Sequence, residues 1–371
     1  MNAPLSRPAE APASSPAEDD ATGGRERILP PTHSLVDERG LFAIGLRTHP
    51  FERVNPLDVK PRHIPLPRAI VRLGLKEWQH FAICDGRYYV SVALFDAKRI
   101  ALVQLIVYDR LERRLVEYEK RTLTPFMQLP NELWADEASY EGGGFSVRFE
   151  NRLREGRHLL HIRAPANDSR PTLKLEIELD EPLDRVEPMV VALPFRRGRA
   201  MYSHKAVLTA RGHIELGETH HTFQDSEAYG LIDIHKGYYP FVMKWHWATG
   251  AVVTPKGLVG FNFTDNQVID QSRFNENGLW VDGKLSPLGP ARFEFDPGDH
   301  LAPWRIRDDE GRVDLRFEPQ TIRKVDINLL VLRSKYRGPF GRFSGTIRDH
   351  RGEAHCLDDA FGMCEDFYLR A

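Results

Sequence analysis

The chain has 371 residues, 41% hydrophobic and 28% charged, which is enough to bury one large core or two ordinary ones. Its formal net charge of −2 gives no reason to expect a nucleic-acid partner, because such proteins usually carry a basic patch. The three cysteines show no paired Cys-x-x-Cys spacing and no disulfide framework, which favours a cytoplasmic protein.

The first 24 residues are rich in Ala, Pro, Ser and acidic residues and contain no apolar run. We therefore predict a disordered tail over residues 1–24, not a signal peptide. Further along, the longest apolar run, Ile100–Tyr108, is far too short to cross a bilayer, so no integral membrane segment is expected.

Strand patterns dominate the first half of the remaining chain. Trp78–Cys84 and Arg87–Phe95 flank Asp85-Gly86, which predicts a tight hairpin whose turn uses positive φ values. More strands are expected at Ile100–Tyr108, Phe145–Asn151, His158–Arg163 and Thr172–Glu178. Only Asn131–Ala138 has a pattern that suggests one or two helical turns.

A second series of short strands follows from Met189 onward, separated by turn signals such as Asp282-Gly283. Its expected strands are Lys205–Ala210, Ala228–Ile234, Pro240–Ala248, Leu258–Phe263, Ala291–Phe295, Val313–Glu318, Asp326–Leu332, Gly341–Arg348, Glu353–Leu357 and Gly362–Tyr368. So many strands exceed one small barrel, so we predict an all-β protein with two antiparallel β-barrel or β-sandwich domains. The predicted domains are residues 25–190 and 191–371.

The segment 228–250 concentrates acidic, basic and aromatic side chains in two strand-like runs. Strand alternation places Asp233 and His235 on one face, opposite Ile232 and Ile234. If that face lines a cavity, desolvation raises the pKa of Asp233 and makes it a candidate general acid, with Lys205 as its charge partner. A solvated face, or a purely structural ion pair, is the alternative.

Aromatic residues form a second part of the candidate site. Trp245 and Trp247 share a strand face with Met243, which suits either an apolar ligand or core packing. Asn262 points away from its neighbours Phe261 and Phe263, so it either fixes a ligand or pins a turn.

Several other kinds of site are not expected. His220 and His221 are adjacent on a strand and face opposite sides, so they do not readily share one metal ion. The sequence has no P-loop, no dinucleotide-binding glycine motif, no His-Glu-x-x-His and no Gly-x-Ser-x-Gly elbow. We therefore predict neither a metal nor a cofactor.

A set of short motifs resembles the bacterial DUF2804 family. The matching motifs are Tyr202-Ser-His-Lys205, Gly212–Gly217, Leu231-Ile-Asp233, Lys236-Gly-Tyr-Tyr-Pro240, Trp245-His-Trp247, Gly260-Phe-Asn262, Gly362-Met-Cys-Glu365 and, in the first half, Leu75-Lys-Glu-Trp78. That family is similar to two-domain lipocalin-like proteins, including carotenoid hydratases and tocopherol cyclase-like enzymes. The resemblance implies lipocalin-like barrels with a pocket for a small hydrophobic molecule.

Two main hypotheses follow. The first is a cofactor-independent hydratase, isomerase or cyclase acting on an apolar unsaturated lipid or terpenoid through Asp233, Lys205 and His235. Its substrate contacts would be Tyr239, Trp245, Trp247, Asn262 and Glu365. The alternative is a non-catalytic carrier of a lipid or other small hydrophobic ligand; a purely structural β-protein is a third reading. The sequence leaves the oligomeric state open.

Overall fold

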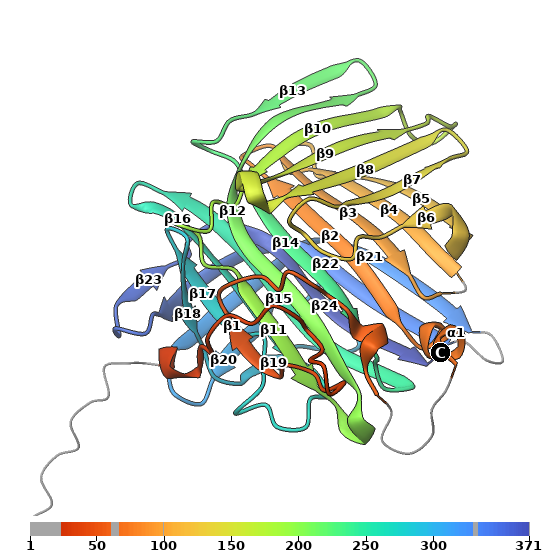
Figure 1. Ribbon diagram of the computed structural model, residues 1–371. Helices are drawn as coiled ribbons and strands as arrows, with labels where there is room; N and C mark the ends of the chain where they lie inside the picture. Colours follow the sequence, from red (N-terminus) through yellow and green to blue (C-terminus); the bar gives the residue numbers. More distant parts are fainter. Residues whose placement is uncertain (1–23, 61–66, 99, 329–332, 371) are drawn as a thin grey trace, which may run out of the picture.

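The regular secondary structure of the computed structural model, which describes residues 24–60, 67–98, 100–328 and 333–370, consists almost entirely of antiparallel β-strands (Figure 1). The described α-helix is α1 (Arg68–Leu73), and short 3₁₀ turns are η1 (Arg25–Arg27), η2 (Pro56–Asp58), η3 (Thr124–Phe126), η4 (Leu153–Glu155) and η5 (Arg196–Gly198). The predicted all-β class is confirmed. Residues 1–23 of the predicted tail lie outside the described residues. Among the residues that the structure describes, no helix is long and apolar enough to cross a membrane.

The first sheet has fourteen strands. Its main path, in spatial order, is β5 (Arg114–Leu123), β4 (Ile100–Asp109), β3 (Tyr88–Asp96), β2 (Lys76–Cys84), β14 (Tyr229–Gly237), β12 (Ala200–Leu216), β10 (Leu173–Asp180), β9 (Arg157–Ala164), β8 (Phe145–Arg152), β7 (Glu137–Gly142) and β6 (Met127–Gln128). Off this path, β12 also pairs with β13 (Thr219–Phe223) and with β11 (Met189–Pro194), which pairs with β1 (Gly45–Arg47).

The second sheet has ten strands. In spatial order they are β18 (Lys284–Pro287), β17 (Gly278–Val281), β16 (Gly257–Asp265), β15 (Val242–Thr254), β24 (Ala360–Arg370), β22 (Arg333–Arg348), β21 (Val313–Asn328), β20 (Trp304–Asp308) and β19 (Ala291–Glu294), with β23 (Ala354–Cys356) beside β22. Part of the predicted strand Asp326–Leu332, residues 329–332, lies outside the described residues.

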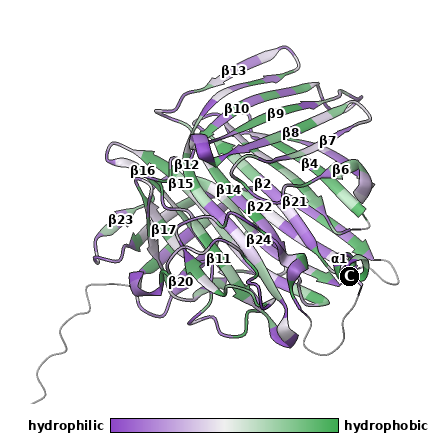
Figure 2. Ribbon diagram, in the orientation of Figure 1, coloured by the Kyte–Doolittle hydropathy of each residue, from purple (hydrophilic) through white to green (hydrophobic). Residues whose placement is uncertain are grey.

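Both sheets curl around their own apolar interior. Phe81 on β2 packs edge-on against Phe149 on β8, with ring centroids 4.9 Å apart, although four strands separate β2 from β8 in the sheet. Figure 2 shows hydrophobic and hydrophilic residues alternating along many of these strands, as expected where the two faces meet different surroundings. The inner faces bury one apolar cluster in each sheet.

A third apolar cluster lies between the two sheets. Tyr229 on β14 donates a hydrogen bond from its hydroxyl to the carbonyl of Phe361 on β24, at 2.7 Å. Close approach also requires Gly260 on β16, because a Cβ there would stand only 2.7 Å from a methyl carbon of Val207 on β12. The candidate site residues lie in this layer between the sheets.

The chain passes from the first sheet to the second between Gly237 and Val242, not near residue 190. Strands β11 to β14 continue the first sheet because β14 pairs along its whole length with β12 on one side and with β2 on the other. The division of the chain between the two sheets therefore does not coincide with the boundary between the predicted domains, residues 25–190 and 191–371.

Two local expectations were wrong. Asn131–Ala138 contains no helix, because Glu132 and Asp136 accept backbone hydrogen bonds that form tight turns before β7 begins. The hairpin between β2 and β3 is present, but neither Asp85 nor Gly86 adopts a positive φ. Instead, Asp85 Oδ1 accepts the backbone N–H groups of Arg87 and Tyr88, each at 2.8 Å, and so closes the turn.

Candidate active site between the sheets

The predicted site residues come together in the layer between the two sheets. Lys205 lies on β12, directly opposite Asp233 on β14 in the strand register, and His235 lies two residues further along β14. Ile232 and Ile234 pack inside the first sheet, so the predicted alternation along β14 is confirmed. From the second sheet, β15, β16 and β24 contribute Trp245, Trp247, Asn262 and Glu365, and Tyr239 lies in the connection between the sheets.

Asp233 is the centre of a buried charged cluster. Its Oδ1 forms an ion pair with Lys205 Nζ and lies 2.8 Å from His235 Nε2. Its other oxygen accepts a hydrogen bond from Trp78 Nε1 at 3.2 Å. His235 Nδ1 is 3.1 Å from the Tyr239 hydroxyl. All the polar atoms of the Asp233 carboxylate therefore have partners.

Glu276 completes this cluster and was not predicted from the sequence. Its Oε1 lies 3.6 Å from Lys205 Nζ and 3.8 Å from His235 Nε2, and its side chain is 2% exposed. The residue belongs to the loop between β16 and β17, where a single Glu beside Asn275 and Asn277 looks like an ordinary turn. No sequence signal connected this loop with β14.

The pKa of Asp233 moves in the direction opposite to our expectation. Burial alone would raise it, but the positive charges of His235 and Lys205 outweigh burial and hold the pKa of Asp233 well below its ordinary value. Burial lowers the pKa of Lys205, yet Asp233 and Glu276 together raise it above normal. These shifts favour the carboxylate form of Asp233 and the ammonium form of Lys205, which does not suit Asp233 as a proton donor.

Glu365 on β24 is the group whose pKa suits a proton donor. Burial raises the pKa of Glu365 to about 7, although hydrogen bonds from Trp245 and Tyr336 oppose that rise. Trp245 Nε1 donates to Oε2 at 3.0 Å and the Tyr336 hydroxyl donates to Oε1 at 2.8 Å. A general acid works best with a pKa near the working pH, which Glu365 satisfies.

Aromatic rings connect Asp233 with Glu365. Trp78 on β2 stacks on His235 with centroids 4.3 Å apart, and it also stacks with Tyr239 at 5.4 Å and Trp245 at 6.2 Å. Trp245 in turn packs against Phe367 at 4.0 Å. Trp78, Trp245, Phe367 and Glu365 are each only partly buried, so these side chains remain reachable from solvent. The sequence analysis placed Trp78 on a predicted strand and in a family motif, but not in the candidate site.

Trp247 and Asn262 lie deeper. Trp247 Nε1 donates to Asn262 Oδ1 at 2.7 Å, and the ring centroid is 5.5 Å from Lys205 Nζ. The Asn262 amide nitrogen donates to the carbonyl of Glu276 at 2.5 Å. Asn262 therefore bonds to protein groups on both sides of its amide, and it fixes the loop that carries Glu276.

A cavity of about 660 Å³ lies elsewhere, at one end of the first sheet. It is lined by residues from η2, α1, β2, β3, β6 and β14, and none of the predicted site residues reaches it. The two regions are nevertheless close in the chain, because Glu77 and Lys236 line the cavity while their neighbours Trp78 and His235 belong to the charged cluster.

Metal-ligand geometry is found away from this site. In the part of the chain that the structure describes, Asp349, Glu353 and His355 offer ligand atoms within 4.8 Å of one another, near β23. His221 lies beside Asp85, at 2.5 Å, whereas His220 packs against His213, so the adjacent histidines point apart.

Two solved structures and one protein family are similar to this chain. CghA, in a crystal structure with Sch210972, matches with a TM-score of 0.50 and 11% identity, covering 80% of this chain and 88% of that one. Kievitone hydratase from Nectria haematococca matches with a TM-score of 0.47 and 10% identity, covering 86% and 94%. No curated protein sequence matches. The family described as "Domain of unknown function (DUF2804)" matches residues 26–370, and this chain therefore belongs to that family.

Proposed function

We propose that the layer between the sheets binds a small apolar unsaturated molecule and catalyses its hydration, isomerisation or cyclisation by acid–base chemistry. The observation that carries this proposal is the pairing of two carboxyl groups with opposite pKa shifts: the pKa of Asp233 is held well below its ordinary value, while the pKa of Glu365 is raised to about 7. Pairs of carboxyl groups with separated pKa values are typical of sites that need both an acid and an anion. CghA was solved with the small molecule Sch210972, and we extend small-molecule binding to this chain.

In this proposal Glu365 donates its proton to an alkene carbon. A new C–H bond forms, the alkene loses its π bond, and positive charge develops on the neighbouring carbon. The faces of Trp78 and Trp245 and the Asp233 carboxylate lie close enough to one another to stabilise that cation. For hydration, water then bonds to the cation and returns a proton to the Glu365 carboxylate. For isomerisation, a neighbouring C–H proton returns instead.

Replacement of Glu365 by Gln tests this role. The wild type, Glu365→Gln and the control Glu318→Gln, whose carboxylate is exposed on β21, are incubated with a lipid extract from the protein's own source. We expect chromatography with mass detection to show a product heavier by one water, or an isomer, with the wild type and the control. Glu365→Gln should be slower by about 10²–10⁴-fold, the usual contribution of a positioned acid. Equal turnover by all three proteins would refute the role of Glu365.

One observation favours a carrier as the second candidate. Asp233 is fully partnered by Lys205, His235 and Trp78, which is also how a structural ion pair looks. Replacing a buried ion pair by apolar residues of similar size is often tolerated. A Lys205→Met/Asp233→Leu variant that still retains the same apolar ligand in native mass spectrometry would favour the carrier. Loss of ligand in a folded variant would favour the enzyme. A cytoplasmic location remains part of this proposal.

A further inference from the structure

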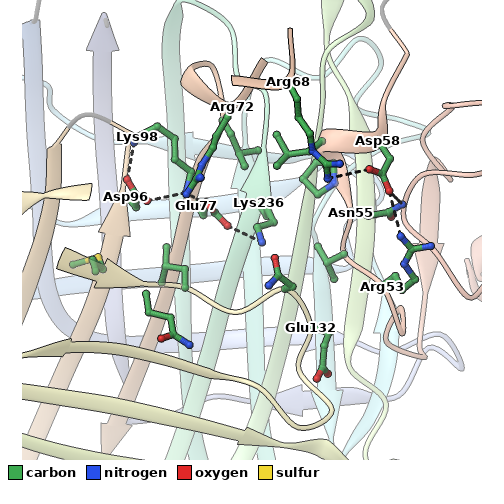
Figure 3. A pocket seen from close by; sticks show the side chains of 18 of the residues that line it. Arg53, Asn55, Asp58, Arg68, Arg72, Glu77, Asp96, Lys98, Glu132 and Lys236 are labelled. Atoms are coloured by element: carbon green, nitrogen blue, oxygen red, sulfur yellow. Dashed lines mark hydrogen bonds and ion pairs between the residues drawn. The ribbon is translucent and has the colours of Figure 1, made fainter. Parts of the chain in front are cut away.

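The cavity of about 660 Å³ at the end of the first sheet is large enough for a small-molecule ligand and has a mixed lining (Figure 3). Apolar side chains from three segments form part of its wall: Val54, Leu75, and Met127 with Leu129. Charged side chains provide most of the remainder. This combination differs from the aromatic layer between the sheets.

The charged side chains at the inner end of the cavity form ion pairs with one another. Glu77 forms ion pairs with both Lys98 and Lys236, the latter at 2.7 Å, and Asp96 also pairs with Lys98 at 2.7 Å. These side chains are at most 9% exposed. The inner charges therefore hold the wall together and leave little for a ligand.

Two of the three carboxylates at the outer end are already engaged, because Glu52 pairs with His33 and Glu132 accepts backbone N–H groups of its own loop. Arg53 and Arg68 share the single carboxylate of Asp58, each at 3.3 Å. Arg72 lines the cavity from α1 and has no ion-pair partner within the described ranges. Figure 3 shows Arg72 extending from α1 beside Glu77 and Lys98, while Arg68 points toward Asp58. A guanidinium group in this position suits a carboxylate, which it can bind through two parallel hydrogen bonds.

The deep side of the same wall offers unpartnered polar atoms. A small cavity of about 20 Å³ shares Val54, Glu77 and Lys236 with the large one and is also lined by Gln79 and Tyr202. Gln79 is 1% exposed and Tyr202 is 2% exposed. Neither the amide of Gln79 nor the hydroxyl of Tyr202 has a hydrogen-bond partner. A space of this size accommodates one water or one hydroxyl oxygen.

We propose that this end of the first sheet is a second ligand site, which binds a lipid-like carboxylic acid bearing a hydroxyl group on its apolar body. Arg72 receives the carboxylate, the apolar wall contacts the body, and Gln79 with Tyr202 receives the hydroxyl. The proposal is independent of the chemistry assigned to Glu365.

Isothermal titration calorimetry with 10-hydroxydecanoate, decanoate and inorganic phosphate tests the proposal. The wild type should bind 10-hydroxydecanoate saturably and more tightly than decanoate, and phosphate should not compete. Arg72→Gln should weaken binding of both acids by about tenfold or more, because a charge-assisted hydrogen bond is lost. Arg39→Gln, which alters an exposed arginine outside the cavity, should match the wild type.

Gln79→Met tests the deep end separately. It keeps the side-chain volume and removes an amide that has no partner, so the protein should stay folded, which circular dichroism checks. Gln79→Met should bind 10-hydroxydecanoate and decanoate with equal affinity, because the partner of the ligand hydroxyl is gone. Glu365→Gln should bind them as the wild type does, which separates this site from the one between the sheets. Absent saturable binding, an unaffected Arg72→Gln variant, or competition by phosphate would overturn the proposal.

Discussion

Asp233 and Glu181 are both buried carboxylates with basic neighbours, but they lie in different surroundings. Glu181 follows β10 inside the first sheet, is 0% exposed, and contacts His158 Nε2 and His204 Nε2, each at 2.8 Å. Burial would raise its pKa, but the two histidines outweigh burial and lower the pKa of Glu181 to about 2. The pKa of Asp233 is also lowered. Asp233 differs from Glu181 because stacked indole rings lie beside it, together with a second carboxyl group, Glu365, whose pKa is raised.

This difference shows what separates a candidate catalytic site from a structural ion pair. A depressed pKa arises wherever a buried carboxylate is fully partnered, so it does not by itself indicate chemistry. The layer between the sheets adds a group near neutrality and aromatic faces that are partly open to solvent. The Glu181 cluster has neither feature, and we expect it to contribute only to stability.

The largest expected effect is on stability at the Glu181 cluster. Glu181→Ala should lower the free energy of unfolding by about 3–5 kcal/mol, because it leaves two buried histidines without their acceptor. Urea unfolding measures this change. Glu176→Ala is the matched control, since it removes a partly exposed carboxylate beside His161 and should cost less than about 1 kcal/mol. A loss at Glu181 as small as at Glu176 would contradict the structural role.

The pH dependence of stability should have opposite signs at Glu365 and Glu181. The folded pKa of Glu365 is about 7, against an ordinary value of 4.5, so its stabilising contribution is complete below pH 4.5 and is lost as pH rises through 7. The folded pKa of Glu181 is about 2, so its contribution is present above pH 4.5 and is lost as pH falls toward 2.

Unfolding free energies at several pH values check both signs. Relative to the wild type, Glu365→Gln should become more stable between pH 5 and pH 8. The loss of unfolding free energy caused by Glu181→Gln, relative to the wild type, should shrink only as the pH falls below 4.5. Parallel curves for wild type and Glu365→Gln across pH 5–8 would show that the pKa of Glu365 is ordinary, and would remove the main support for its acid role.

A smaller effect is expected at His80, which lies near the Asp233 cluster on β2. Burial lowers the pKa of His80 to about 4, although Asp233 partly opposes this, so the ring is neutral in the folded protein at pH 5. Because the unfolded chain takes up a proton below pH 6.5, stability should fall as pH decreases from 6.5 to 4. His80→Gln should remove that part of the slope in thermal unfolding. An unchanged slope would mean that His80 is already protonated in the folded protein.

Much of the fold could be predicted from the sequence because alternation and turn residues are local signals. The faces of β14 and β15 were predicted correctly, and the residues on them do meet between the sheets. Asp282-Gly283 likewise adopts positive φ at both positions between β17 and β18, as its sequence indicates.

The rest depends on packing between distant segments. Glu276 lies near Lys205 in a loop to which Asn262 donates a hydrogen bond, and Trp78 lies near Asp233 because β2 pairs with β14. The direction of the Asp233 pKa depends on distances to His235 and Lys205 that no spacing reveals. The cavity beside α1 could not be predicted either, because segments from five parts of the chain form it.

Burial on both faces constrains the number of residues in β14. Every residue from Tyr229 to Gly237 is buried, with Asp233 and His235 on one side and Ile234 and Lys236 on the other. One inserted or deleted residue would exchange these sides. Asp233 and His235 would then point into the apolar interior of the first sheet, and Ile234 would point toward Trp78 and Trp245 between the sheets. Related chains should therefore vary in the loops around this strand while keeping its number of residues constant.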